Sequence, residues 1–160
     1  MTILKIVEHP AAILETKCRP VTTFNSELKR LVRDMQETMI EADGVGLAAP
    51  QIGMDIRLAI VDVEDEHGLI VLVNPELIAS SGSQTDIEGC LSFPELYGIV
   101  TRPNAINIKA QNVKGQMFTF QAEGFLARAI LHEMDHLDGI LFTSKVEKYI
   151  PSEELERVDS

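Results

Sequence analysis

The sequence contains no tryptophan, and aromatic residues make up only 5% of its 160 residues. The core must therefore be packed mainly from aliphatic side chains. Only two cysteines are present, which allows at most one internal disulfide and excludes a disulfide-rich secreted scaffold. An intracellular protein keeps such cysteines reduced, and we expect a cytoplasmic location.

Basic residues are also scarce, because 14 lysines and arginines stand against 25 aspartates and glutamates, for a formal net charge of −11. A nucleic-acid-binding protein needs a clustered basic surface that displaces counterions, and the sequence has none. No apolar run approaches the roughly 20 residues that cross a bilayer, and the first ten residues lack the pattern of a secretory signal. We therefore expect neither nucleic acid nor a membrane among the partners.

The length suits one domain, and we expect it to span residues 1–150, followed by a short acidic tail over residues 151–160. After an irregular arm at residues 3–24, hydrophobic periodicity predicts two helices and two pairs of strands. The predicted helices are residues 26–42 and 125–137, and the predicted strands are residues 57–63, 69–73, 106–111 and 116–121. Glycines and a proline in residues 44–53 indicate a tight loop.

The stretch His132-Glu-Met-Asp-His136 carries the clearest chemical signal. Two imidazoles four residues apart lie on one face of a helix and can reach a single metal ion. Glu133 sits about 100° round the helix axis, where it can handle the protons of a water on the metal but is poorly placed as a ligand. Most other positions of this helix are apolar, so a bound metal would satisfy the buried polar groups. The pattern is typical of metallohydrolases.

Two histidines leave a tetrahedral site one protein ligand short if water takes the fourth place. His9, Cys18 and His67 are candidates, although they lie in the irregular arm or in an exposed turn. Cys90 is favoured, because a thiolate is a strong ligand and the predicted loop Glu88-Gly-Cys-Leu-Ser92 can be shaped around it. Without the histidine pair, Cys90 would be interpreted as a small buried core residue.

Three segments, in this order, resemble the peptide deformylase family: Gly44-Val-Gly-Leu-Ala-Ala-Pro-Gln51, Glu88-Gly-Cys-Leu-Ser92 and His132-Glu-Met-Asp-His-Leu-Asp-Gly139. H-E-x-x-H alone occurs in many zinc peptidases, whereas E-G-C-L-S is much more specific. The resemblance extends from about Ile3 to Tyr149. It implies an α+β fold in which antiparallel or mixed β-sheets pack around a central helix that carries the H-E-x-x-H motif.

The resemblance also implies a metal-dependent hydrolase that removes the formyl group from the N-terminal formyl-methionine of newly made polypeptides. Its partners would be N-formylmethionyl peptides and nascent chains. Some relatives dock on the ribosome with a long basic C-terminal helix, and the acidic tail offers no counterpart, so ribosome contact should be weak or transient. Residues 1–150 would be the catalytic domain.

The residues that match the family motifs receive roles from the resemblance. Cys90, His132 and His136 match the metal ligands, and Glu133 matches the general acid and base. Gln51 and the backbone N–H of Leu91 match the groups that bind the developing oxyanion. One divalent ion per chain is implied, with Fe²⁺ favoured, and Zn²⁺, Ni²⁺ and Co²⁺ are compatible with the same ligands.

Further residues are assigned by position. We expect the methionine pocket to be lined by Val45, Gly46, Tyr97, Phe125 and Ala129, all of which would be ordinary packing residues in another protein. Glu88 and Arg102 are either a solvated ion pair or partners that brace the ligand loop and the imidazoles. Asp135 either assists them or is exposed.

One departure from the family pattern concerns Leu131, because the family usually has glutamine directly before the first histidine. Two rival functions remain open. An H-E-x-x-H endopeptidase would take its third ligand from a distant glutamate or histidine instead of Cys90. A non-catalytic relative would bind formylated peptides or metal without turnover, although the intact Gln51, Cys90 and Glu133 argue against it.

Overall fold

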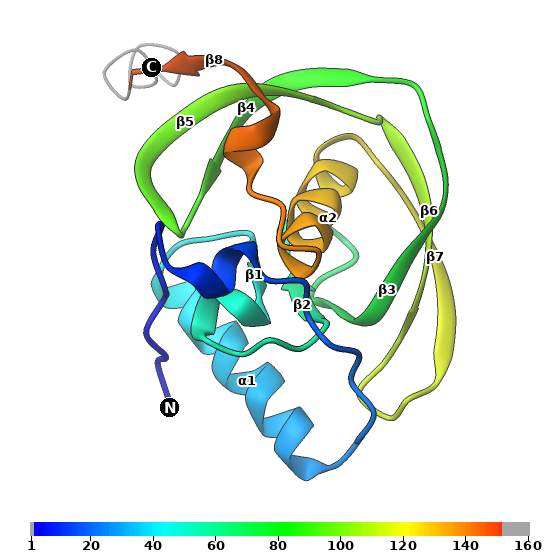
Figure 1. Cartoon of the computed structure of the whole chain (residues 1–160). Coiled ribbons are helices and arrows are strands. Elements are labelled where there is room, and N and C mark those ends of the chain that lie inside the picture. The colour runs from blue at the N-terminus through cyan, green and yellow to red at the C-terminus, as the bar shows by residue number, and fades with distance from the viewer. Residues whose placement is uncertain (1, 152–160) are drawn as a thin grey trace.

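Two antiparallel β-sheets and helix α2 (Gly124–Leu137) form the centre of the fold in the computed structural model, which describes residues 2–151 (Figure 1). One sheet has five strands in the order β1-β2-β3-β6-β7, and the other has three in the order β4-β5-β8. The strands are β1 (Gly46–Ala48), β2 (Leu58–Val61), β3 (Ile70–Ser81), β4 (Gln84–Cys90), β5 (Phe93–Arg102), β6 (Ala105–Gln111), β7 (Met117–Glu123) and β8 (Val146–Ile150). The α+β class with α2 in the centre is therefore confirmed.

Both predicted helices are present. Helix α1 (Ser26–Glu41) begins after Asn25, whose side chain accepts a hydrogen bond from the backbone N–H of Leu28 at 3.1 Å. This N-cap satisfies one of the free N–H groups of the first turn. The apolar face of α1 packs against β1 and β2 through buried side chains such as Met35 and Met39. Helix α1 ends one residue before the predicted boundary, and α2 begins one residue earlier than predicted.

The first predicted strand pair needs a correction. Strand β2 is shorter than the predicted 57–63, whereas β3 continues eight residues beyond the predicted end at Val73. Asn74 and Pro75 indicate a break in the sequence, but the chain passes them through a bulge, with Asn74 at a φ of 51°. The Asn74 side chain bonds the backbone N–H and C=O of Val21, which holds the bulge in place. The second pair, β6 and β7, forms the predicted hairpin.

The three-stranded sheet was not predicted. Strand β4 contains Asp86, Glu88 and Gly89, which have low strand propensity, but its pairing with β5 outweighs that preference. The expected loop position of Cys90 was therefore wrong. Cys90 is the last residue of β4 and lies opposite Phe93, beyond a register shift that follows Gly89. This hairpin carries the thiol towards α2.

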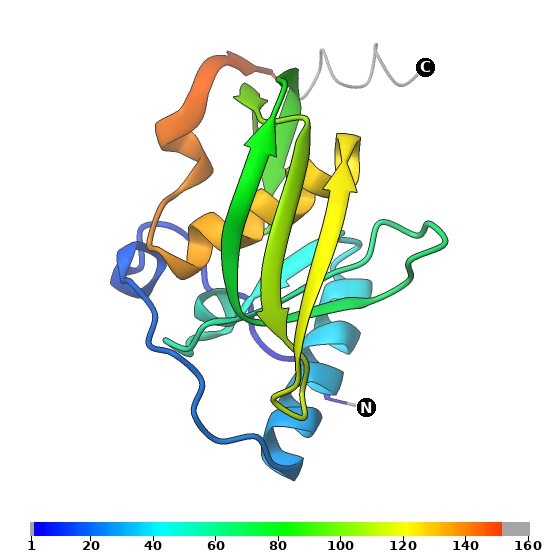
Figure 2. The ribbon, with the colours of Figure 1, turned by 90° about the vertical axis from the view of Figure 1, so that its right-hand side faces the viewer.

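Helix α2 lies between the two sheets and crosses behind β3, β6 and β7 in the view of Figure 2. One side packs on the five-stranded sheet through an aliphatic cluster that includes Ile108 and Ile130. The arm before α1 forms no strand, as predicted, and contains the short 3-10 helix η1 (Ala12–Glu15). Except for Pro151, the predicted acidic tail lies outside the described residues. Among the described residues, neither α-helix is long and apolar enough to cross a bilayer.

Candidate metal centre and active site

The side chains of Cys90, His132 and His136 converge between β4 and α2. The histidines lie one turn apart on α2, with ring centroids 5.1 Å apart. The Sγ atom of Cys90 lies 3.2 Å from Nε2 of His136. One donor atom from each of the three residues lies within 4.8 Å of the other two. The structure thus brings together the three predicted ligands.

The other ligand candidates lie elsewhere. His9 stacks on Phe93, with ring centroids 4.8 Å apart. His67 belongs to an exposed group with Asp65 and Glu66 in the turn before β3. Cys18 is buried, and burial raises the pKa of its thiol to about 11, which disfavours the thiolate that a metal requires.

A divalent ion fits the three converging side chains. One sulfur and two imidazole nitrogens form a donor set that suits Zn²⁺, Fe²⁺ and related ions. Nε2 of His136 is the ring nitrogen that faces the Cys90 sulfur, and Oε1 of the neighbouring Glu133 is a buried polar atom without a partner among the described residues. Burial lowers the pKa of His136 to about 3, so its ring is neutral, as a ligand must be.

Glu88 holds the ring of His132 from behind. Its Oε1 lies 2.7 Å from Nδ1 of His132, and Arg102 donates to both carboxylate oxygens at 2.6 and 2.8 Å. Burial opposes ionisation of this carboxyl, but the hydrogen bonds from Arg102 and His132 prevail and lower its pKa well below the ordinary range. An ionised Glu88 accepts the Nδ1–H of His132, which leaves Nε2 free to bind a metal.

Arg102 connects Glu88 to a second carboxylate. Its Nη1 donates to Asp135 on α2 at 2.9 Å, and the Lys145 ammonium also lies near Asp135. Glu88 and Arg102 are 7% and 4% exposed, so they form a buried ion pair rather than a solvated one. Asp135 is also largely covered, so it belongs to this network.

Glu133 points into the site from the same helix and is 5% exposed. Burial raises the pKa of its carboxyl to about 7, which is well above the ordinary value. A carboxyl with such a pKa can both accept and release a proton near neutrality. Gly46 of β1 lies directly against it, because a Cβ at this position would meet Oε2 of Glu133 at 2.5 Å.

Gln51 is 1% exposed and lies in the short 3-10 helix η2 (Ala49–Ile52). Its Oε1 accepts the backbone N–H of Ala48 at 2.9 Å, which holds the amide in place. Its Nε2 donates to Ser92 Oγ at 3.2 Å and lies 3.6 Å from the Cys90 sulfur. The NH₂ end of the amide is therefore oriented towards the converging ligands.

A cavity of about 370 Å³ opens beside these groups. Its walls include all five residues predicted to bind substrate, which are Val45, Gly46, Tyr97, Phe125 and Ala129, together with Gln51, Cys90, Leu91, His132 and Glu133. Phe125 is 54% exposed and Val45 is 39% exposed, so both stand at the rim. The cavity can therefore admit a side chain next to the ligands.

Two findings go beyond the predicted residues. Arg128, which was not predicted, is 1% exposed and donates to Glu88 Oε2 at 2.6 Å. A lone arginine four residues before His132 in an apolar helix was the signal that could have identified it.

Leu131 packs in the aliphatic cluster between α2 and the five-stranded sheet and is not among the residues that line the cavity.

The comparisons with known proteins point to one family. A family model described as polypeptide deformylase matches residues 3–151. Peptide deformylase 1 of Bacillus subtilis (strain 168) is 56% identical over 155 residues, which is 97% of each chain. Peptide deformylase 1 of Bacillus cereus is 54% identical over 98% of this chain and 100% of its own. The crystal structure of peptide deformylase from Thermotoga maritima has a TM-score of 0.89 at 36% identity, covering 92% of this chain and 99% of its own.

Proposed function

The chain belongs to the peptide deformylase family, whose members are hydrolases that remove the formyl group from N-terminal methionine peptides, and we propose which residues of this chain perform the reaction. The observation that carries the proposal is the convergence of one sulfur and two imidazoles beside a buried carboxyl. The reaction releases formate and leaves a free N-terminus.

Cys90, His132 and His136 are the proposed ligands of one divalent ion, with Fe²⁺ as the expected ion and Zn²⁺, Ni²⁺ or Co²⁺ as alternatives. When bound, the ion acts as a Lewis acid that makes water nucleophilic near neutral pH and withdraws electron density from a carbonyl oxygen. Glu88 and Arg102 support the ligands, since Glu88 fixes the His132 ring and Arg102 fixes Glu88.

Glu133 is the proposed general base and acid. Its carboxylate takes a proton from water as the water oxygen attacks the formyl carbon, and its carboxylic acid then gives that proton to the departing amine. A pKa of about 7, raised by burial, suits both steps, because both forms are populated at neutral pH.

The developing negative charge on the formyl oxygen needs fixed hydrogen-bond donors. The Gln51 side-chain NH₂ and the backbone N–H of Leu91 are the proposed donors. The bond from Ala48 to Gln51 Oε1 supports this role, because it fixes which end of the amide faces the site.

The cavity beside the ligands is the proposed site for the methionine side chain. Val45 and Gly46 form one wall, and Phe125 and Ala129 of α2 form another. Tyr97 packs its ring over Gly89, where a Cβ would meet the ring at 2.6 Å, and so closes the side towards the three-stranded sheet. The largely apolar wall of Phe125, Ala129 and Val45 supports this use.

The proposed setting is the cytoplasm, where N-formylmethionyl nascent chains would be the substrates. Contact with the ribosome is proposed to be weak or transient, and neither nucleic acid nor a membrane is a proposed partner. The net charge of −11 supports this, since an acidic protein is repelled by nucleic acid and by anionic lipid.

Formate release from formyl-Met-Ala-Ser, measured without oxygen after loading with Fe²⁺ or Ni²⁺, tests the proposal. We expect turnover by the native chain, and a loss of about 10²-fold or more for Glu133→Gln with its metal content unchanged. Cleavage of internal peptide bonds would instead support an endopeptidase, and binding without formate would support a non-catalytic relative.

A further inference from the structure

Arg128 is a buried arginine to which the reaction above gives no role. It is 1% exposed and lies on α2 among apolar neighbours. Three of its nitrogens donate to β4: Nη1 to Glu88 Oε2 at 2.6 Å, Nε to Gln84 Oε1 at 3.3 Å and Nη2 to the Gln84 carbonyl at 3.2 Å. A guanidinium is buried at high cost unless it is paired in this way.

These bonds connect the two elements that carry the ligands. Arg128 and His132 are four residues apart on α2 and therefore lie on one face of the helix. Gln84 and Glu88 are four residues apart on β4 and therefore lie on one face of the strand. Helix α2 is thus attached to Glu88 at two successive turns, and β4 ends two residues later at Cys90. The separation between the thiol and the imidazoles depends on this attachment.

The two oxygens of Glu88 have separate partners on α2. Oε1 lies against His132 Nδ1, whereas Oε2 accepts from Arg128. Arg102 also contacts both oxygens, but it comes from β5 and reaches α2 only through a second side chain, Asp135. Arg128 is the described residue that holds Oε2 from the helix that carries the histidines.

Each charge in this group also has a partner of opposite sign. The two arginines, Arg102 and Arg128, stand against Glu88 and Asp135, and the ammonium of Lys145 reaches Asp135 from a partly exposed position. Without Arg128, the buried Oε2 of Glu88 would lose one of its two charged partners next to a metal ligand and keep only Arg102. The expected response is a change in the position of Glu88 and hence of the His132 ring.

We propose that Arg128 is a positioning residue that fixes Glu88 against His132 and so sets the geometry of the three metal ligands. The inference rests on the proposed metal centre. Truncating a hydrogen-bond partner behind a metal ligand typically weakens metal affinity about 10- to 100-fold. Glu88 keeps its two bonds from Arg102, so Arg128→Met should weaken binding by about 10-fold, near the lower limit.

The test uses Co²⁺ with the metal-free full chain, because a Co²⁺–thiolate centre absorbs light in a way that reports ligand geometry. The spectrum, the Co²⁺ affinity and the unfolding midpoint are measured for the native chain, Arg128→Met and Arg128→Lys. Lysine keeps the charge but cannot contact Glu88 and Gln84 at once. We expect a shifted spectrum and weaker binding for both variants. Because Arg128 also lines the cavity proposed for the methionine side chain, the metal readouts and not KM report its role towards the ligands.

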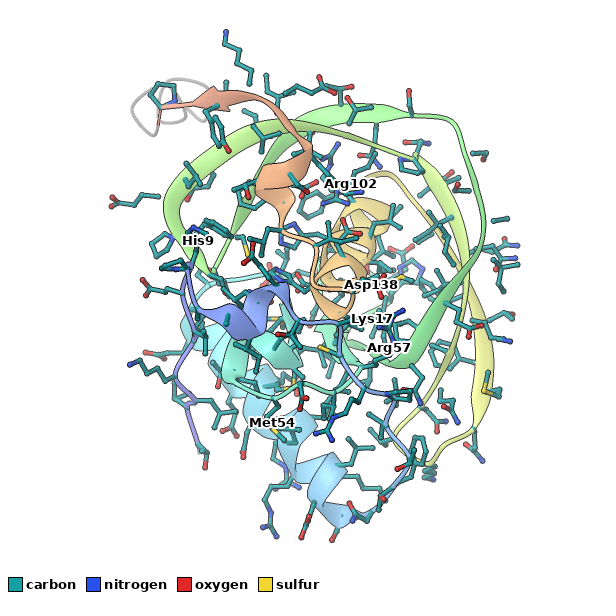
Figure 3. All side chains as sticks on the ribbon, viewed as in Figure 1. His9, Lys17, Met54, Arg57, Arg102 and Asp138 are labelled. Atoms are coloured by element: carbon teal, nitrogen blue, oxygen red, sulfur yellow. The ribbon has the colours of Figure 1, made fainter. Side chains whose placement is uncertain are left out.

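Arg57→Met is the matched control. Arg57 also ties α2 to a neighbouring element, because its Nη1 donates to the Leu137 carbonyl and to Asp138 at the other end of the helix. Figure 3 shows Arg57 beside Asp138, away from Arg102. This variant should lower the unfolding midpoint and leave the Co²⁺ spectrum unchanged.

Three outcomes separate the possibilities. If the Arg128 variants keep the native Co²⁺ spectrum and affinity and lose only stability, as Arg57→Met does, Arg128 stabilises the fold without positioning the ligands. That result would overturn the inference. If Arg128→Met fails to fold, a native spectrum and affinity in Arg128→Lys would overturn it equally. A native chain that binds no Co²⁺ would refute the metal centre itself, and that failure is seen before any variant is compared.

Discussion

Replacing Gly46 by alanine should displace the general base without touching a metal ligand. A Cβ on Gly46 would lie 2.5 Å from Oε2 and 2.9 Å from Cγ and Cδ of Glu133, whereas ordinary contacts begin at 3.4 Å. The carboxylate must therefore retreat by about 0.9 Å, and it cannot turn out into solvent freely because Glu133 is buried. A misplacement of about 1 Å can cost roughly 10²-fold in rate. We expect Gly46→Ala to lower kcat by about that factor.

The assay is formate release at saturating formyl-Met-Ala-Ser, with metal content measured on the same sample. Gly98→Ala is the matched control, because its Cβ would meet the Val146 side chain of β8 at the same 2.5 Å and no atom of Glu133. We expect the control to lose stability and to keep kcat per metal-loaded chain. If Gly46→Ala keeps the native kcat with full metal content, the position of Glu133 does not limit the reaction and the reasoning fails.

Three further predictions concern residues around the same centre. Gln51→Ala should lower kcat about 10²- to 10³-fold with unchanged metal content, and an unchanged kcat would remove Gln51 from the oxyanion site. Leu131→Gln should leave turnover nearly unchanged but lower the free energy of unfolding in urea by about 1–3 kcal/mol, because it places an amide in the aliphatic cluster; native stability would show that the amide finds a partner. Burial lowers the pKa of His132, but hydrogen bonds to Cys90 and Glu88 prevail and raise it above 6.5. The ring must lose this proton to bind metal, so Co²⁺ affinity should rise with pH above 6.5; affinity independent of pH would contradict this.

The ligands on α2 could be predicted because their geometry is local. A spacing of four residues in an apolar helix places His132 and His136 on one face, whatever surrounds the helix. The position of Glu133 beside the metal site follows from the same helix geometry. Cys90 could be favoured chemically, but its approach to the histidines depends on the β4–β5 hairpin, whose pairing is long-range and leaves little trace in the sequence.

The parts that the sequence did not predict depend on contacts between distant segments. Asn74 and Pro75 would end a strand by local preference, but the bonds from Asn74 to Val21 allow β3 to continue. Arg128 carries a charge in an apolar helix, and its partners Gln84 and Glu88 are 40 or more residues away. Such pairings are visible only after the sheets are placed.

Metal titration of the metal-free chain, followed by formate release, tests the central claim most directly. If Cys90, His132 and His136 hold the one ion that the reaction needs, activity should rise in proportion to added Fe²⁺ or Ni²⁺ and stop rising at one ion per chain. Cys90→Ala should remove both the tight site and the activity. Formate release by the metal-free chain, or full activity in Cys90→Ala, would contradict the account.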